Sequence, residues 1–350
     1  MEYQLVQHGR AALEFIAELG SRAARLRPRI QSEMQVRGLN EQTLADDLDA
    51  RLTQVDEAMR DSPAFAAMSR ISEWLSLQHG EVARAAFEAQ REEFLPRIHA
   101  LQNGPTTLEA NAAVPSPDYF RDVWIHRTTG GWDGHEYQGF IHGELVHREY
   151  VAKNYPGDIF AQRRAVLATL PRRDYRQIME FGTSSGHYTM QLAREFPAAH
   201  ITGCDLSIRM LEQAQRLGNE QGSAWRLLQR PAENTGLPNT SFDLVTSYIV
   251  LHEIPAQITR AQMREAFRLL RPGGDLLFCD VTRYSALDKL GVFWAEYQAI
   301  NGGEPFWREA ASLDLACAAH EAGFVDVRSE GLDGKSYPWL LYGRRPGLAS

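Results

Sequence analysis

The sequence predicts an α/β protein, in which a doubly wound, mainly parallel sheet follows an all-α N-terminal domain. Three observations support this prediction. Residues 1 to about 103 carry apolar residues at helical spacing and almost no strand pattern. From about residue 158, short apolar runs alternate with helical patterns, as in parallel sheets covered on both faces. Between these regions, glycine, proline and aromatic residues interrupt any regular pattern.

These observations divide the chain into three parts. Residues 1–103 form the helical domain, where Leu13 and Ile16 begin one of several apolar stripes. Residues 104–157 are a linker rich in aromatic residues such as Trp124 and Trp132. Long irregular segments are uncommon in compact domains unless they act as lids, so we expect this one to cover a site. Residues 158–350 form the α/β domain.

The α/β domain is expected to begin with a helix, after which strands and helices alternate. Its last two strands are separated only by a loop and are therefore free to pair in the antiparallel direction. The expected helices are 159–170, 188–195, 208–217, one ending near residue 270, and 313–322; the expected strands are 177–181, 200–204, 225–229, 242–247, 275–280, 325–329 and 339–343.

The composition limits the partners of this chain. Its 350 residues carry a net charge of −8, so no global positive field would draw it to nucleic acid or anionic lipid. No apolar stretch reaches the length of a membrane span. The three cysteines form no CxxC pair and no disulfide framework. We expect a cytoplasmic protein that binds a small molecule, with no nucleic-acid or membrane partner, and a homodimer remains open.

A glycine motif follows the first apolar strand directly. Residues 180–186 read E-F-G-T-S-S-G and open a helix. Glycines at such a turn allow a ligand to approach the backbone closely, and ligands of open α/β sheets bind beyond the carboxyl ends of the strands. The spacing is G-x-x-x-G, not the G-x-G-x-x-G of dinucleotide-binding proteins.

Four segments in order make residues 160–345 resemble the class I S-adenosylmethionine-dependent methyltransferases. They are the loop 180–186, the segment 203–211, the segment 232–245 and the turn 269–274. The resemblance implies a Rossmann-like fold and S-adenosylmethionine as cofactor. It places Asp205 at the ribose, Glu180 near the methionine ammonium, and Ala232 with Glu233 near the adenine. The full set of expected cofactor residues is Glu180, Gly182, Thr183, Ser184, Gly186, Asp205, Leu206, Met210, Ala232, Glu233 and Ser247.

Two positions depart from the family pattern. Ser184 stands where the family usually has a middle glycine, and a serine tolerates that turn less well. Its hydroxyl can instead hold the carboxylate of the cofactor. Pro231 stands where the family often has an acid, so the adenine contacts are less well specified than the ribose contacts.

His252 is the catalytic residue that the sequence predicts. It follows the fourth strand, at the edge where a methyl acceptor would approach. An imidazole titrates near neutrality, so His252 is able to take a proton from a hydroxyl or amine acceptor. The alternative is that it braces the helix that follows.

Aromatic residues are expected around the sulfonium and the acceptor. Aromatic faces attract cations, more strongly where water is excluded. Residues 293–307 contain a second aromatic cluster that either lines the acceptor pocket or packs against the helical domain. The predicted pocket residues are Tyr137, Tyr150, Tyr248, Trp294 and Tyr297.

No metal site is predicted. His126, His135, His142 and His147 fall within the linker, but their spacing matches no standard zinc pattern and no cysteine lies nearby.

The expected function is transfer of a methyl group from S-adenosylmethionine to a small organic acceptor, by in-line displacement in a lidded pocket. One alternative is a non-methyl use of the cofactor, by cyclisation or 3-amino-3-carboxypropyl transfer, which releases methylthioadenosine. The other is a non-catalytic binding or assembly protein.

Overall fold

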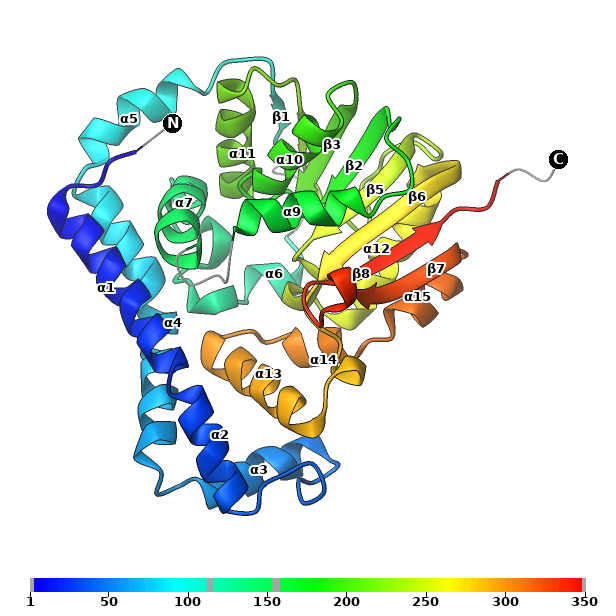
Figure 1. Cartoon of the computed structure of the whole chain (residues 1–350). Helices are drawn as coiled ribbons and strands as arrows, with labels where there is room; N and C mark the ends of the chain where they lie inside the picture. The colour runs from blue at the N-terminus through cyan, green and yellow to red at the C-terminus, as the bar shows by residue number, and fades with distance from the viewer. Residues whose placement is uncertain (1–2, 112–115, 153–157, 348–350) are drawn as a thin grey trace.

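One eight-stranded sheet forms the centre of the molecule (Figure 1). The computed structural model describes residues 3–111, 116–152 and 158–347. The strand order is β1-β4-β3-β2-β5-β6-β8-β7. The strands are β1 (Thr107–Glu109), β2 (Gln177–Phe181), β3 (His200–Asp205), β4 (Arg226–Gln229), β5 (Phe242–Tyr248), β6 (Leu270–Asp280), β7 (Val325–Gly331) and β8 (Trp339–Arg344).

The sheet is parallel from β1 to β6 and antiparallel at its C-terminal edge. β2 lies between β3 and β5 and pairs in parallel with both. β8 inserts between β6 and β7 and runs antiparallel to each of them. The predicted doubly wound sheet with an antiparallel last strand is therefore confirmed.

Helices cover both faces of the sheet. One face packs against α9 (Ile159–Ala168), α10 (His187–Glu195) and α11 (Ile208–Glu220), and the other against α12 (Ala256–Leu269) and α15 (Leu315–Glu321). In β6, Leu276 and Phe278 face α12 and α15, whereas Leu277 and Cys279 face the opposite layer. This alternation follows from the two-residue repeat of a strand, and it buries apolar side chains on both faces.

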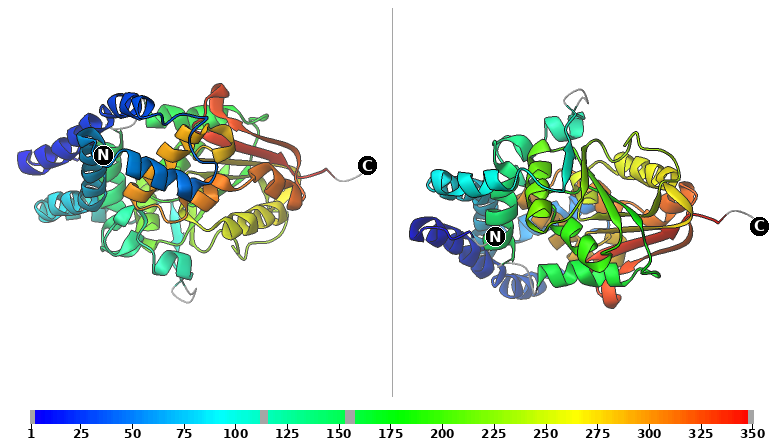
Figure 2. Two further views of the ribbon diagram at one scale, coloured as in Figure 1. Left: turned by 90° about the horizontal axis from the view of Figure 1, so that it is seen from below. Right: turned by 90° about the horizontal axis from the view of Figure 1, so that it is seen from above.

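The N-terminal region is helical, as predicted. Its helices are α1 (Gln7–Ala24), α2 (Arg27–Val36), α3 (Leu48–Ala58), α4 (Pro63–Glu88) and α5 (Arg91–Ala100). The long helix α4 begins where the sequence signals it: Ser62 Oγ accepts a hydrogen bond from the Phe65 amide, and Pro63 occupies the first turn. Both views of Figure 2 place α1 and α5 at the end of the molecule opposite the C-terminus.

The second aromatic cluster joins the two regions. α13 (Lys289–Gly302) and α14 (Trp307–Ser312) follow β6 and the short helix η5 (Tyr284–Ala286). Phe293, Trp294 and Tyr297 of α13 are buried with Phe65 and neighbouring residues of the N-terminal helices. The predicted pocket roles of Trp294 and Tyr297 need correction, because these rings fill the interface between α13 and α4.

The predicted linker and lid contains more regular structure than expected. Its first part supplies β1, which pairs in parallel with β4 and extends the sheet. A three-residue strand is too short to show an alternating pattern in sequence. Residues 112–115 and 153–157 of the predicted lid lie outside the described residues. The rest forms α6 (Asp118–Arg121), η1 (Ile125–Arg127), η2 (Gly131–Asp133), α7 (Gln138–Phe140) and η3 (Ile141–Val151).

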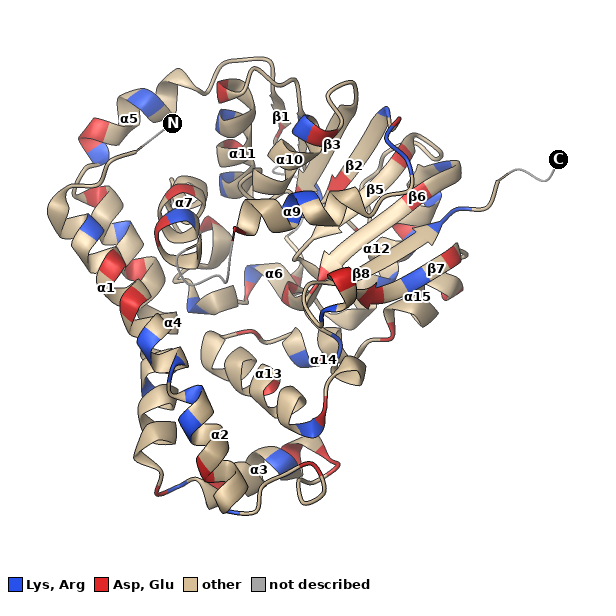
Figure 3. Ribbon diagram, in the orientation of Figure 1, with Lys and Arg blue, Asp and Glu red and all other residues tan. Residues whose placement is uncertain are grey.

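Charge is distributed over the outer helices in both signs. Arginines are interspersed with glutamates on α1, α5 and α11 (Figure 3). Among the described residues, none of the helices combines the length and apolar character needed to cross a membrane.

Candidate functional site

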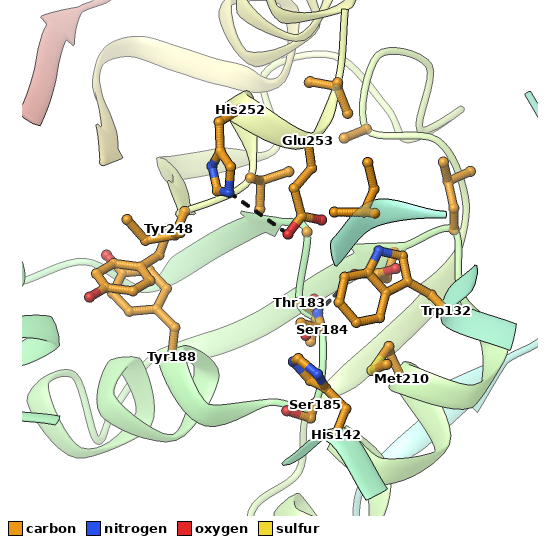
Figure 4. A pocket seen from close by; sticks show the side chains of 18 of the residues that line it. Trp132, His142, Thr183, Ser184, Ser185, Tyr188, Met210, Tyr248, His252 and Glu253 are labelled. Carbon is orange, nitrogen blue, oxygen red and sulfur yellow. Dashed lines mark hydrogen bonds and ion pairs between the residues drawn. The ribbon is translucent and has the colours of Figure 1, made fainter. Parts of the chain in front are cut away.

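A cavity of about 360 Å³ lies beyond the carboxyl ends of β2, β3 and β5. Its walls come from the glycine loop, the ends of these strands and the segment 119–151 (Figure 4). A volume of this size suits a small-molecule site. The predicted site residues that line it are Gly182, Thr183, Ser184, Asp205, Leu206, Met210, Ala232, Glu233, Tyr248 and His252.

The glycine loop has the left-handed backbone that its sequence suggested. Gly182 has φ of 71°, and a Cβ placed on it would lie 2.4 Å from Val250 Cγ2. Any side chain at this position would therefore be strained and would clash. Ser184, which replaces the usual middle glycine, also has a positive φ of 50°. The serine adopts the turn at an energetic cost.

Asp205 is fixed at the end of β3 by backbone donors. Its Oδ2 accepts from the Ser184 amide at 2.8 Å, and its Oδ1 accepts from the Ser207 amide at 2.9 Å. Burial raises the pKa of Asp205 to about 6, although both amides favour the charged form. The carboxylate links the glycine loop to the start of α11 and keeps lone pairs for a ligand in the cavity.

Three predicted cofactor residues lie outside the cavity lining. Glu180 is buried beneath the loop, where its carboxyl accepts from Thr189 Oγ1 at 2.6 Å. Burial raises the pKa of Glu180 to about 8. Ser247 is fully buried within β5, and Gly186 caps α10. None of these three residues lines the cavity, so in this structure they support the glycine loop and do not face a ligand.

The segment 119–151, called the covering segment below, packs directly against the glycine loop and α11. A Cβ placed on Gly139 would lie 2.1 Å from the carbonyl oxygen of Arg209, so only glycine fits between α7 and α11. Ser207 Oγ donates to Asp133 Oδ1 at 2.6 Å. Tyr119 donates to Glu233 at 2.6 Å. The segment therefore forms the wall over the end of the cavity where the family resemblance places ribose and adenine.

Trp132 and His142 complete this wall. Their rings meet edge-on, with centroids 4.8 Å apart, and Figure 4 shows them on the same side as Met210 and the loop residues 183–185. Burial lowers the pKa of His142 to about 3, so the imidazole is neutral at neutral pH. The sequence showed a histidine- and tryptophan-rich linker but not which members would face the cavity.

The far side of the cavity carries two stacked tyrosines. Tyr188 and Tyr248 lie with ring centroids 4.8 Å apart (Figure 4). The Arg163 guanidinium lies 5.0 Å above the ring of Tyr248 and contacts His147 at 2.9 Å. Tyr248 was predicted as a pocket residue. Tyr188 and Arg163 were missed, because both stand at positions that read as ordinary helix faces.

A polar wall formed by His252, Glu253 and His126 faces the end of β5. Asp280 binds both His252 Nδ1, at 3.2 Å, and the Leu251 amide. Burial lowers the pKa of His252, but Asp280, Glu304 and Glu253 outweigh it and raise the pKa to about 9. The expected ionisation near neutrality therefore needs correction: this histidine holds its proton at neutral pH, which favours the brace over the base.

The backbone leading into this wall is strained. Ile249, between Tyr248 and Val250, has φ of 57°. A β-branched residue rarely adopts a positive φ, and such strain concentrates at functional sites. The Ile249 amide donates to the Cys279 carbonyl at 2.7 Å, which holds the turn in place.

The structure does not bring the other predicted tyrosines to the cavity. Tyr137 is buried in the core of α1, α4 and α5, where its hydroxyl contacts His99 Nε2 at 3.1 Å. Tyr150 stacks on His79 of α4, with ring centroids 5.5 Å apart. Both rings attach the covering segment to the N-terminal helices, so their predicted contact with the sulfonium needs correction.

Comparison with known proteins places residues 178–274 in the family model described as "Methyltransferase domain". The chain is 35% identical over 121 residues to trans-aconitate 2-methyltransferase of Deinococcus radiodurans, covering 33% of this chain and 42% of that protein. It is 30% identical over 167 residues to malonyl-[acyl-carrier protein] O-methyltransferase of Hahella chejuensis, covering 47% and 57%. The chain thus spans about half the length of the curated relatives it matches.

A solved structure of phosphoethanolamine N-methyltransferase 2 from Haemonchus contortus, with S-adenosyl-L-methionine, aligns with a TM-score of 0.47 and 18% identity. The alignment covers 68% of this chain and 61% of that one. The matched family model spans β2 to the turn in β6, which includes the glycine loop and Asp205. Residues 178–274 of this chain therefore match a methyltransferase domain.

Proposed function

We propose that this chain transfers a methyl group from S-adenosylmethionine to a small organic acceptor bound in the same cavity. One observation carries the proposal: Gly182, Ser184 and Asp205 line a single covered cavity together with the polar wall around His252. A cofactor bound at Gly182, Ser184 and Asp205 would present its methyl group to an acceptor bound at the polar wall. Methyl transfer also agrees with the names of the curated relatives.

The described contacts support one orientation of the cofactor. The Asp205 carboxylate is fixed by two amides and is suited to accept both ribose hydroxyls. Met210, Ala232 and Glu233 line the adjoining wall, where the adenine would lie. The methionine part would then extend over the loop toward Ser185 and His142.

The transfer itself needs little chemistry from the protein. A lone pair of the acceptor would attack the methyl carbon, and the carbon–sulfur bond would break with its electron pair left on sulfur, which gives S-adenosylhomocysteine. The acceptor would lose one proton to the solvent, so that the product gains one methylene. Holding the two reactants in line is sufficient for much of the rate. The covering segment would exclude water from the reacting groups.

Binding and product analysis test the proposal together. Calorimetry with S-adenosylmethionine should show one site per chain, and incubation with pooled metabolites should yield S-adenosylhomocysteine with a product heavier by one methylene. Methylthioadenosine as the product would replace methyl transfer by cyclisation or aminocarboxypropyl transfer. Binding without any product from the cofactor, across a broad acceptor panel, would favour a non-catalytic protein.

A further inference from the structure

We propose that His126, His252 and Glu253 form a binding site for a divalent first-row transition-metal ion on the acceptor side of the cavity. The role of such an ion in catalysis rests on the proposed function, but its binding does not. The three residues line the cavity and come from two segments far apart in the chain, η1 and η4 (Leu251–Glu253). Two imidazoles and one carboxylate are a common ligand set for such ions.

The ligand atoms already converge. One ligand atom from each residue lies within 4.8 Å of the others. Glu253 Oε1 lies 3.3 Å from His126 Nε2 and 3.9 Å from His252 Nε2, and the dashed line in Figure 4 marks the second contact. Ligands about 2.1 Å from one ion stand roughly 3.0–3.4 Å apart, so side-chain adjustments of about 1 Å would complete the site.

Both imidazoles have the outer partners that metal-binding histidines use. His126 Nδ1 contacts Glu304 Oε1 at 2.7 Å, and His252 Nδ1 contacts Asp280 Oδ1 at 3.2 Å. A carboxylate on Nδ1 fixes the ring and leaves Nε2 free to bind a metal. In both residues it is Nε2 that faces Glu253. Each histidine therefore has an outer carboxylate on Nδ1 and the shared Glu253 carboxylate near Nε2.

The charge around the three residues also favours a cation. Glu253, Glu304 and Asp280 supply three carboxylates, and Arg283 lies 3.7 Å from Asp280. A metal ion would displace the protons that the two imidazoles hold, and with both imidazoles neutral two negative charges remain uncompensated, which matches a divalent ion. The second oxygen of Glu304 is buried and has no hydrogen-bond partner among the described residues.

An ion at this point would have coordination positions open to the cavity. Three protein ligands leave at least one position for a further ligand, as in sites where a metal binds a reactant. The acceptor class that fits is a molecule with an oxygen donor, such as a hydroxyl, enol or carboxylate. Binding that oxygen would hold the acceptor in line with the methyl group.

Metal binding is measured on the untagged full chain after treatment with a chelator. Titration with Zn²⁺ should show one equivalent bound, and Co²⁺ should give visible absorption bands of a nitrogen- and oxygen-ligated ion. His126→Gln and Glu253→Gln should each weaken Zn²⁺ binding by about tenfold or more, and Glu304→Gln by roughly 10–100-fold if it acts through His126. Melting curves verify that each variant folds.

Two controls separate the possible results. His135→Gln removes a histidine that pairs with Glu88 at 2.8 Å outside the cavity, and it should leave Zn²⁺ binding unchanged. Asp205→Asn should weaken S-adenosylmethionine binding but not Zn²⁺ binding. Stoichiometric Zn²⁺ that survives His126→Gln, or no Zn²⁺ binding by a chain that still yields S-adenosylhomocysteine, would overturn the metal site and leave a network of ion pairs. A bound ion without methyl transfer would instead contradict the proposed function.

Discussion

At the cofactor end of the cavity, residues 182–185 and 204–206 line the cavity from two adjacent strand ends, β2 and β3. The polar wall on the other side takes His126 from the covering segment, His252 from the end of β5, and its outer carboxylates from β6 and the loop after α13. The first region depends on short motifs, and the second on the packing of distant segments. The two regions should therefore respond differently to substitution.

Backbone strain also differs between them. At the cofactor end, the left-handed positions are Gly182, Ser184 and Gly186, so glycine fills two of the three. At the polar wall, the left-handed residues are His126, with φ of 54°, and Ile249, with φ of 57°, and that conformation is costly for a β-branched residue. Surrounding contacts must offset the backbone strain at the polar wall, whereas the loop has little strain because glycine occupies most of its left-handed positions.

The largest effect is expected at Gly182. Gly182→Ala adds a left-handed penalty of about 1–2 kcal/mol and an overpacking cost of about 1–3 kcal/mol against Val250. The free energy of unfolding, measured with urea, should fall by the sum of the two.

Gly222→Ala is the matched control, because Gly222 has φ of 64° but a Cβ placed on it would have no atom within 4 Å. It should show the left-handed penalty alone. Val250→Ala in the Gly182→Ala background should restore part of the loss. Equal losses at Gly182 and Gly222 would mean that the loop tolerates the added methyl group.

The next effect concerns affinity. Asp205→Ala should weaken S-adenosylmethionine binding by about 1.5–3 kcal/mol, which is roughly 10–150-fold, because hydrogen bonds to a charged group are lost. Asp205→Asn keeps one oxygen for one of the two backbone amides and turns its NH2 group toward the other, so it should bind weakly and lose some stability, which melting curves measure. Unchanged affinity in calorimetry would remove Asp205 from the cofactor site.

The third effect is a pH dependence at Glu180. Its folded pKa of about 8 lies above its ordinary value of 4.5. The folded state therefore binds the proton more tightly, and the contribution of Glu180 to stability is lost as pH rises from about 4.5 to about 8. Glu180→Gln should leave stability at pH 5 nearly unchanged and flatten this loss. A parallel pH profile for both proteins, measured by urea unfolding, would show that Glu180 is ionised in the folded state.

The smallest effect is expected at Ser184. Ser184→Gly relieves a left-handed penalty of about 1–2 kcal/mol. It also increases the conformational entropy of the unfolded chain, which lowers the stability by about 0.4–1 kcal/mol. A net gain in stability of up to about 1.6 kcal/mol is expected, with Ser184→Ala as the control that keeps the strain. A loss on Ser184→Gly would indicate that the hydroxyl makes a stabilising contact.

Sequence reasoning was most successful where structure is local. The strands β2, β3 and β5 and the helices α10, α11 and α12 were predicted within a few residues, because each has its own apolar period and its own boundary signals. The glycine loop was located from its motif directly after β2, whereas the ribose role of Asp205 comes from the family resemblance and stays a prediction. Tyr137, Tyr150, Trp294 and Tyr297 were misplaced, since an aromatic residue in sequence does not reveal which neighbour will bury it.

The sequence by itself determined the sheet domain, its antiparallel edge and the position of the glycine loop after β2. These features depend on periodicity and turn chemistry, which act over a few residues. The tertiary structure alone decided that β1 joins the sheet, that α13 packs on α4, and that His126 meets His252 and Glu253. Those contacts join residues more than a hundred positions apart. Their formation depends on how whole elements pack, which no local pattern encodes.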